Sequence, residues 1–194
     1  MNLLKHLPNA ITIIRLLLVL PIAYLILENR FLPALVLFAM AGLSDGLDGF
    51  LARRYGWVTT FGRLIDPLAD KLMMMTTTLA LGLTGHFPLM LMILVLAKDL
   101  AILGGVFSYT TLAGFPTIRP TLLGKVTTAS QIVLLVSVLV ELAGPGLLAG
   151  LLFKDWFTAG CWIVTILTIG DGISYLWIWT TRLARDPRWK EIIT

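Results

Sequence analysis

The sequence is poor in cysteine and in charge. Its 194 residues include one cysteine, Cys161, so no disulfide can form within the chain. Only 13% of the residues are charged, whereas 58% are hydrophobic. The first apolar segment also lacks a signal-peptide pattern, because no small-residue cleavage site follows a short apolar region. We therefore expect this segment to remain in the mature protein.

The apolar runs are long enough to cross a hydrocarbon layer, which takes about 20 helical residues. We therefore predict an all-α integral membrane protein with six transmembrane helices in one catalytic domain over residues 1–194. Residues 1–9 form a juxtamembrane segment and residues 182–194 a basic tail. The predicted spans are 10–28, 32–52, 65–85, 88–112, 122–143 and 156–181.

Lysine and arginine positions predict the orientation, because cytoplasmic flanks carry the excess of these residues. One side of the membrane receives Lys5, Arg53, Arg54, Arg63, Arg119, Lys125, Arg182, Arg185, Arg188 and Lys190. The opposite side receives only Arg30 and Lys154. The first side is therefore predicted to be cytoplasmic, and both termini are expected there.

Four aspartates fall in one of the most apolar regions of the chain. Asp45 and Asp48 are three residues apart, and Asp66 and Asp70 are four apart, so each pair shares one face of a helix. Each intramembrane carboxylate costs on the order of 3 kcal/mol on insertion scales. The short linker between the two pairs makes their helices antiparallel neighbours. We therefore predict that the four carboxylates converge near the cytoplasmic surface around divalent cations.

Oxygen ligands select hard cations, so two Mg²⁺ or Mn²⁺ ions would balance these four charges. Such a pair suits phosphoryl-type transfer, because it can stabilise both the attacking and the leaving oxygens. Gly49 and Gly62 leave room for a ligand near the backbone, and Arg53 can bind a diphosphate bidentately. An ion pathway or a proton relay could also use intramembrane acids, but it would not need these glycines or this arginine.

The spacing of these residues resembles the signature of the CDP-alcohol phosphotransferase family at every defined position. The pattern is Asp45-x-x-Asp48-Gly49-x-x-Ala52-Arg53, eight residues, then Gly62-x-x-x-Asp66-x-x-x-Asp70. The resemblance implies a six-helix membrane fold, a homodimer, and displacement of CMP from a CDP-linked donor by an acceptor hydroxyl.

The resemblance also implies roles for the individual residues. Asp45, Asp48 and Asp66 would bind the metals, and Asp70 would both bind metal and deprotonate the acceptor. A carboxylate near a metal-bound nucleophile can act as this base if it lies within hydrogen-bond reach. The nucleotide and diphosphate would be bound by Gly49, Ala52, Arg53, Gly62 and, from a family-like pattern in the first span, Asn9, Thr12 and Arg15.

Charged residues in the fourth and fifth spans are candidates for binding an anionic acceptor. Lys98 is followed by Asp99, and adjacent opposite charges are disfavoured against lipid, so we expect Lys98 to point into the protein. We predict that Lys98, Arg119 and Lys125 hold the acceptor phosphate. Asp171 receives no function from the sequence; hydrogen bonding to Thr165 or Thr168, or protonation, could accommodate it.

Longer stretches of the chain resemble the cardiolipin synthases of the family. Residues 39–50, 65–71 and 119–131 carry this likeness, which implies transfer of a phosphatidyl group from CDP-diacylglycerol to phosphatidylglycerol. Phosphatidylglycerophosphate synthases share the box from Gly124 to Gln131 but use glycerol 3-phosphate, so this activity is the alternative. Lys98 departs from the arginine that both groups have at this place. Two bulky lipid substrates would need lateral openings between helices, whereas a closed aqueous cavity would favour the alternative.

Two other classes are compatible with intramembrane aspartates. A membrane prenyltransferase also binds diphosphate through metal-bound aspartates but has two separated acidic motifs, and a magnesium transporter needs a continuous polar path.

The partners expected here are CDP-diacylglycerol, an anionic acceptor, membrane lipid and a second copy of the chain, and no nucleic acid.

Overall fold

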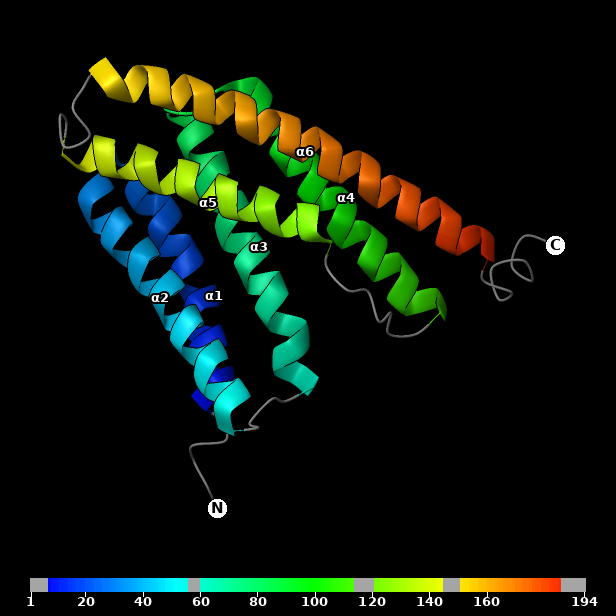
Figure 1. The fold of residues 1–194 in the computed structure, drawn as a ribbon. Coiled ribbons are helices and arrows are strands. Elements are labelled where there is room, and N and C mark those ends of the chain that lie inside the picture. The colour runs from blue at the N-terminus through cyan, green and yellow to red at the C-terminus, as the bar shows by residue number, and fades with distance from the viewer. Residues whose placement is uncertain (1–6, 56–59, 114–120, 145–150, 186–194) are drawn as a thin grey trace. The chain divides into compact units, whose positions relative to one another are not determined.

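The structure is a computed structural model that describes residues 7–55, 60–113, 121–144 and 151–185. In this part of the chain it has six helices and no strand. The helices are α1 (Leu7–Leu27), α2 (Phe31–Tyr55), α3 (Thr60–Leu83), α4 (Leu89–Ala113), α5 (Leu122–Ala143) and α6 (Leu151–Arg185) (Figure 1). Side chains are not described for residues 7–11, 45–55, 60–67, 106–113, 151–152, 179 and 182–185. The predicted all-α class and the six helical segments are confirmed.

Two helix ends are fixed by the same backbone motif. After α1, Arg30 N–H donates to Leu25 O at 2.8 Å and Asn29 N–H to Ile26 O at 2.9 Å, while Asn29 has a φ of 57°. After α3, His86 N–H donates to Leu81 O at 2.9 Å, and Gly85 has a φ of 77°. Both are Schellman motifs, which use a left-handed residue to satisfy the last carbonyls of a helix.

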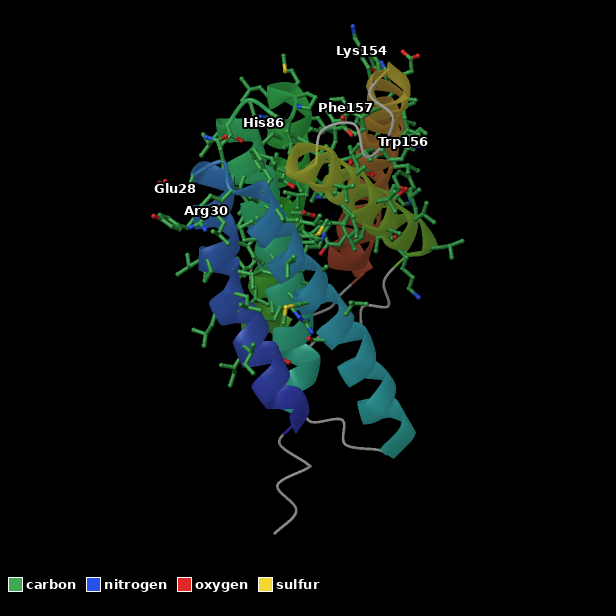
Figure 2. The ribbon with its side chains drawn as sticks, turned by 90° about the vertical axis from the view of Figure 1, so that its left-hand side faces the viewer. Glu28, Arg30, His86, Lys154, Trp156 and Phe157 are labelled. Atoms are coloured by element: carbon green, nitrogen blue, oxygen red, sulfur yellow. The ribbon has the colours of Figure 1, made fainter. Side chains whose placement is uncertain are left out.

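The two Schellman turns lie at the same end of the packed helices. The rings of Phe31 and His86 meet edge to face, with centroids 5.1 Å apart. Figure 2 shows Glu28, Arg30 and His86 gathered at this end. Since α1 and α3 both end here and α2 begins here, α2 runs antiparallel to α1 and to α3. The opposite directions of α2 and α3 agree with the prediction.

Contacts divide the chain into two compact units. The first contains residues 1–89 and 135–154, and the second contains residues 90–134 and 155–194. In the first unit, α1 packs against both α2 and α3. Small buried residues such as Ala34, Ala69 and Ala80 let these backbones approach closely. The single six-helix domain stays a prediction.

In the second unit, side-chain contacts set the directions of α4, α5 and α6. Lys98 and Ile102 of α4 meet Asp171 and Tyr175 of α6 in ascending order, so these two helices are parallel. Thr127 Oγ1 of α5 donates to Leu167 O at 3.3 Å. A Cβ at Gly160 would lie 3.0 Å from Leu134 of α5. Later residues of α5 therefore contact earlier residues of α6, so the two helices are antiparallel.

Polar side chains lie inside the helical packing, and apolar side chains cover much of its exterior. Leu17 is 67% exposed, Leu20 74% and Met90 84%. Exposed apolar surface of this extent is unusual for a water-soluble monomer and indicates an interaction surface. Among the described side chains, the buried polar residues are Thr12, Arg15, Thr77, Thr78, Lys98, Asp99, Thr127, Gln131, Thr168 and Asp171.

Within the described residues, two helical segments are long and apolar enough to span a membrane, Leu122–Ala143 and Phe153–Ile178. Thr12–Leu27 and Phe31–Ser44 are shorter apolar helical segments. The aspartate motif interrupts the apolar sequence of α2 and α3, and Lys98 and Asp99 interrupt that of α4. Membrane crossing by all six helices stays a prediction.

Candidate active site

The aspartate motif occupies the end of α2 and the beginning of α3. Asp45 and Asp48 are helical residues of α2, and Asp66 and Asp70 belong to α3. Of these four side chains, the structure describes that of Asp70. Convergence of the four carboxylates on two cations therefore stays a prediction. The motif's remaining residues are Gly49, Ala52 and Arg53 on α2 and Gly62 on α3, and their side chains also lie outside the described part.

Asp70 is held by an arginine from another helix. Arg15 Nη1 on α1 donates to Asp70 Oδ1 at 2.6 Å. The arginine side chain is 1% exposed, whereas that of Asp70 is 46% exposed. A buried guanidinium needs an anionic partner to offset its desolvation, and a short charge-assisted hydrogen bond fixes both groups. Arg15 thus holds Asp70 at Oδ1, while the Asp70 side chain stays half-exposed.

The polar face of α1 is directed into the first unit. Thr12, one turn before Arg15, is 1% exposed. Ala69, the neighbour of Asp70 on α3, is fully buried. The structure therefore brings Arg15 and Asp70 of the predicted site together on two helices that pack against each other, and Thr12 is buried one turn from Arg15 on α1. Asn9 is helical in α1, and its side chain lies outside the described ones.

Lys98 is buried, as its acidic neighbour predicted. Its Nζ lies 3.1 Å from Asp99 Oδ1 and 3.5 Å from Asp171 Oδ2, and its side chain is 4% exposed. Lys125, in the first turn of α5, is exposed, and Arg119 falls outside the described residues. The ammonium of Lys98 is therefore already engaged by two carboxylates, and an acceptor phosphate would share it with them.

Asp171 is the residue whose place the sequence did not reveal. Neither threonine that we considered is its partner: Thr165 Oγ1 donates to Cys161 O at 2.7 Å, and the buried Thr168 Oγ1 has no partner among the described atoms. The partner is Lys98, 73 positions earlier. In the sequence, the available signal for this pair was that Lys98 and Asp171 are both charged residues in apolar segments, where charges are rare.

An apolar cavity of about 590 Å³ lies between α4 and α6 of the second unit. Its walls include Ala101 of α4 and the side chains of Ile173 and Leu176 of α6, which are each 62% exposed. The cavity therefore opens at the surface of the unit. Lys98, Thr168, Tyr175 and Thr180 add polar groups to an otherwise apolar lining.

Residues 5–169 match the CDP-alcohol phosphatidyltransferase family. The chain belongs to this family. The match includes all four aspartates of the motif, Arg15 and Lys98, and it ends two residues before Asp171. The resemblance inferred from the aspartate signature is therefore confirmed, and so is the class of transferase it implied.

Relatives of two kinds are similar to this CDP-alcohol phosphatidyltransferase. A cardiolipin synthase (CMP-forming) of Rattus norvegicus is 33% identical over 155 residues, which cover 71% of this chain and 50% of the relative. The chain thus spans about half the length of that curated relative. A CDP-diacylglycerol–glycerol-3-phosphate 3-phosphatidyltransferase of Rickettsia typhi is 31% identical over 176 residues, 89% of this chain and 96% of the relative. The Bacillus subtilis protein of the same name is 29% identical over 187 residues, which cover 88% of this chain and 93% of the relative.

Both kinds of relative are named as phosphatidyltransferases or as a CMP-forming synthase, which agrees with the donor chemistry inferred from the motif. The names of the second kind state glycerol 3-phosphate, whereas the name of the first kind states the product. Similar identities to both kinds leave the acceptor to be inferred from the site itself.

Proposed function

We propose that this protein transfers the phosphatidyl group of CDP-diacylglycerol to phosphatidylglycerol, giving cardiolipin and CMP. Membership of the family and the complete aspartate signature support the transfer chemistry. The apolar cavity beside Lys98 supports phosphatidylglycerol as the acceptor, because a lipid with an anionic headgroup needs a lateral apolar opening next to positive charge. A water-soluble acceptor needs no such opening.

In the proposed reaction, the acceptor hydroxyl attacks the phosphorus that carries diacylglycerol, and the bond to the CMP oxygen breaks. Asp70 accepts the hydroxyl proton. Arg15 fixes the Asp70 carboxylate through Oδ1, so the accessible part of that carboxyl group can face the acceptor. This is a general-base role, which requires hydrogen-bond reach more than an unusual acidity.

The metal-ligand atoms of the motif fit two hard divalent cations, Mg²⁺ or Mn²⁺, because they are all carboxylate oxygens. Asp45, Asp48, Asp66 and Asp70 would hold them. When bound, the cations supply positive charge that neutralises the diphosphate and the leaving CMP. Asn9, Thr12, Arg15, Gly49, Ala52, Arg53 and Gly62 would contact the nucleotide and diphosphate.

Lys98, Arg119 and Lys125 would bind the acceptor phosphate. The protein would be a multi-pass integral membrane protein of the bacterial inner-membrane type, with both termini and the active site in the cytoplasm. It would act as a homodimer. The exposed apolar side chains of α1 and α4 support a lipid-facing exterior.

The alternative acceptor is glycerol 3-phosphate, which would make the protein a phosphatidylglycerophosphate synthase. The Rickettsia typhi relative favours this alternative, because the similarity covers 96% of that protein. Both acceptors are anionic, so both suit the basic side chains of Lys98, Arg119 and Lys125.

A competition assay tests the proposal. The purified protein receives CDP-diacylglycerol, magnesium, and equal saturating amounts of phosphatidylglycerol and glycerol 3-phosphate, and the lipid products are identified by mass spectrometry. Cardiolipin as the main product is expected, whereas phosphatidylglycerophosphate alone would establish the alternative. A chelator should stop CMP release, and added Mg²⁺ or Mn²⁺ should restore it.

A further inference from the structure

Asp171 connects three helices of the second unit. It lies on α6, and its Oδ2 is 3.5 Å from Lys98 Nζ on α4. Its Oδ1 lies against the first turn of α5, where a Cβ added to Gly124 would come within 3.1 Å of it. Asp171 is only 5% exposed. One carboxylate thus contacts both neighbouring helices, and it lies outside the region that matches the family.

The contact with Lys98 differs from the contact that Lys98 makes with Asp99. Asp99 is the next residue on α4 and moves with Lys98, although its Oδ1 is the nearer oxygen at 3.1 Å. Asp171 belongs to another helix. Because a buried ammonium needs paired anions to offset its desolvation, the carboxylate on α6 fixes the position of the Lys98 ammonium between α4 and α6.

The contact with α5 depends on a glycine. Gly124 N–H donates to Thr121 Oγ1 at 3.0 Å, so Thr121 caps the start of α5. A Cβ at Gly124 would lie 3.0 Å from that hydroxyl and 3.1 Å from Asp171 Oδ1, so one of the neighbours would have to move. The glycine allows the carboxylate to sit against the positive end of the α5 dipole.

We propose that Asp171 is a positioning residue for the acceptor: it sets the spacing between Lys98 on α4 and Lys125, which follows Gly124 on α5. These are two of the cations that would bind the acceptor phosphate, so the inference rests on the proposed function. Without Asp171, Lys98 keeps, among the described side chains, the ion pair with Asp99 of its own helix, and the first turn of α5 loses a buried contact.

The Asp171→Asn variant tests this role because it removes the charge and keeps the shape. Its apparent KM for phosphatidylglycerol should rise about tenfold, as expected when a charge-assisted contact is lost. Its KM for CDP-diacylglycerol should change less than about twofold, which is a difference of about 0.4 kcal/mol. An equal rise for donor and acceptor would overturn the proposal. So would a lower acceptor KM, since Asp171 would then compete with the acceptor for Lys98.

Two glycine variants provide a matched comparison. Gly124→Ala keeps every charge but crowds Asp171, so it should also raise the acceptor KM. Combining it with Asp171→Asn should add little, because both changes disturb one contact. Gly104→Ala on α4 is the control, since an added Cβ there meets nothing within 4 Å. Equal effects of the two glycine variants would contradict the role of Asp171.

A stability cycle tests the contact independently of activity. Melting temperatures are compared for Lys98→Met, Asp171→Asn and the double variant in the full-length protein in detergent. The double variant should be destabilised less than the sum of the singles, because each single leaves a buried charge without its partner. Additive losses would overturn the proposal. If the wild type forms neither product, the proposed function is wrong, while this cycle still decides whether Asp171 holds Lys98.

Discussion

Each compact unit contains a buried cation paired with a carboxylate from another helix, but the two pairs differ in access. In the first unit, Arg15 is 1% exposed while the Asp70 side chain is 46% exposed. In the second unit, the side chains of Lys98, Asp99 and Asp171 are 4%, 1% and 7% exposed. An accessible carboxylate can exchange a proton or bind a cation, whereas the enclosed carboxylates of Asp99 and Asp171 hold the Lys98 ammonium in place.

Replacing Asp70 by Asn should have the largest effect on activity. The amide cannot accept the acceptor proton, so kcat should fall by about 10²–10⁴-fold, the usual contribution of general-base catalysis. CMP release from labelled CDP-diacylglycerol measures this loss, and donor binding should survive in part. Asp155→Asn, at an exposed aspartate of α6, is the control. Full activity of the Asp70 variant would remove the base assignment.

Replacing Arg15 by Met should have the next largest effect. Asp70 would lose the bond that fixes Oδ1, and a misplaced catalytic group costs on the order of 10²-fold in rate. The Arg15→Lys variant keeps the charge without the planar guanidinium and should lie between wild type and Arg15→Met. Equal kcat values for all three proteins would show that the orientation of Asp70 does not depend on Arg15.

Loss of Lys98 should destabilise the protein more than loss of Arg15 does. Lys98→Met leaves two enclosed carboxylates without their ammonium, and breaking a buried pair costs about 3–5 kcal/mol. Arg15→Met should destabilise less, because the half-exposed Asp70 can be hydrated. Chemical unfolding of both variants measures the difference. A larger stability loss for Arg15→Met would reverse our comparison of the units.

Filling the cavity should have the smallest effect and should discriminate between acceptors. Ala101→Phe places a bulky ring in the cavity lining, so the KM for phosphatidylglycerol should rise about threefold. This is less than the roughly tenfold or larger effect of a misfit in an enclosed apolar pocket, because the cavity opens at the surface. Any use of glycerol 3-phosphate should be unaffected. Ala159→Phe, at an exposed position of α6 outside this lining, is the control. An unchanged KM for the lipid would separate the cavity from acceptor binding.

The helices could be placed from the sequence to within a few residues at most ends. The predicted segment 122–143 coincides with α5, and the breaks after Glu28 and at Gly85 coincide with the two Schellman turns. The largest differences are at α3, which begins at Thr60, and α6, which extends from Leu151 to Arg185. Apolar runs mark only the parts suited to lipid, whereas helical hydrogen bonds continue through polar residues.

The sequence by itself determined the helical class, the family and the candidate residues of the site, because apolar runs and aspartate spacing are local properties of the chain. Burial of Lys98 also followed from its immediate neighbour. Only the tertiary structure decided that Arg15 binds Asp70, 55 positions away, and that Lys98 binds Asp171. Ion pairs between helices depend on which faces pack together, and no local pattern encodes that choice.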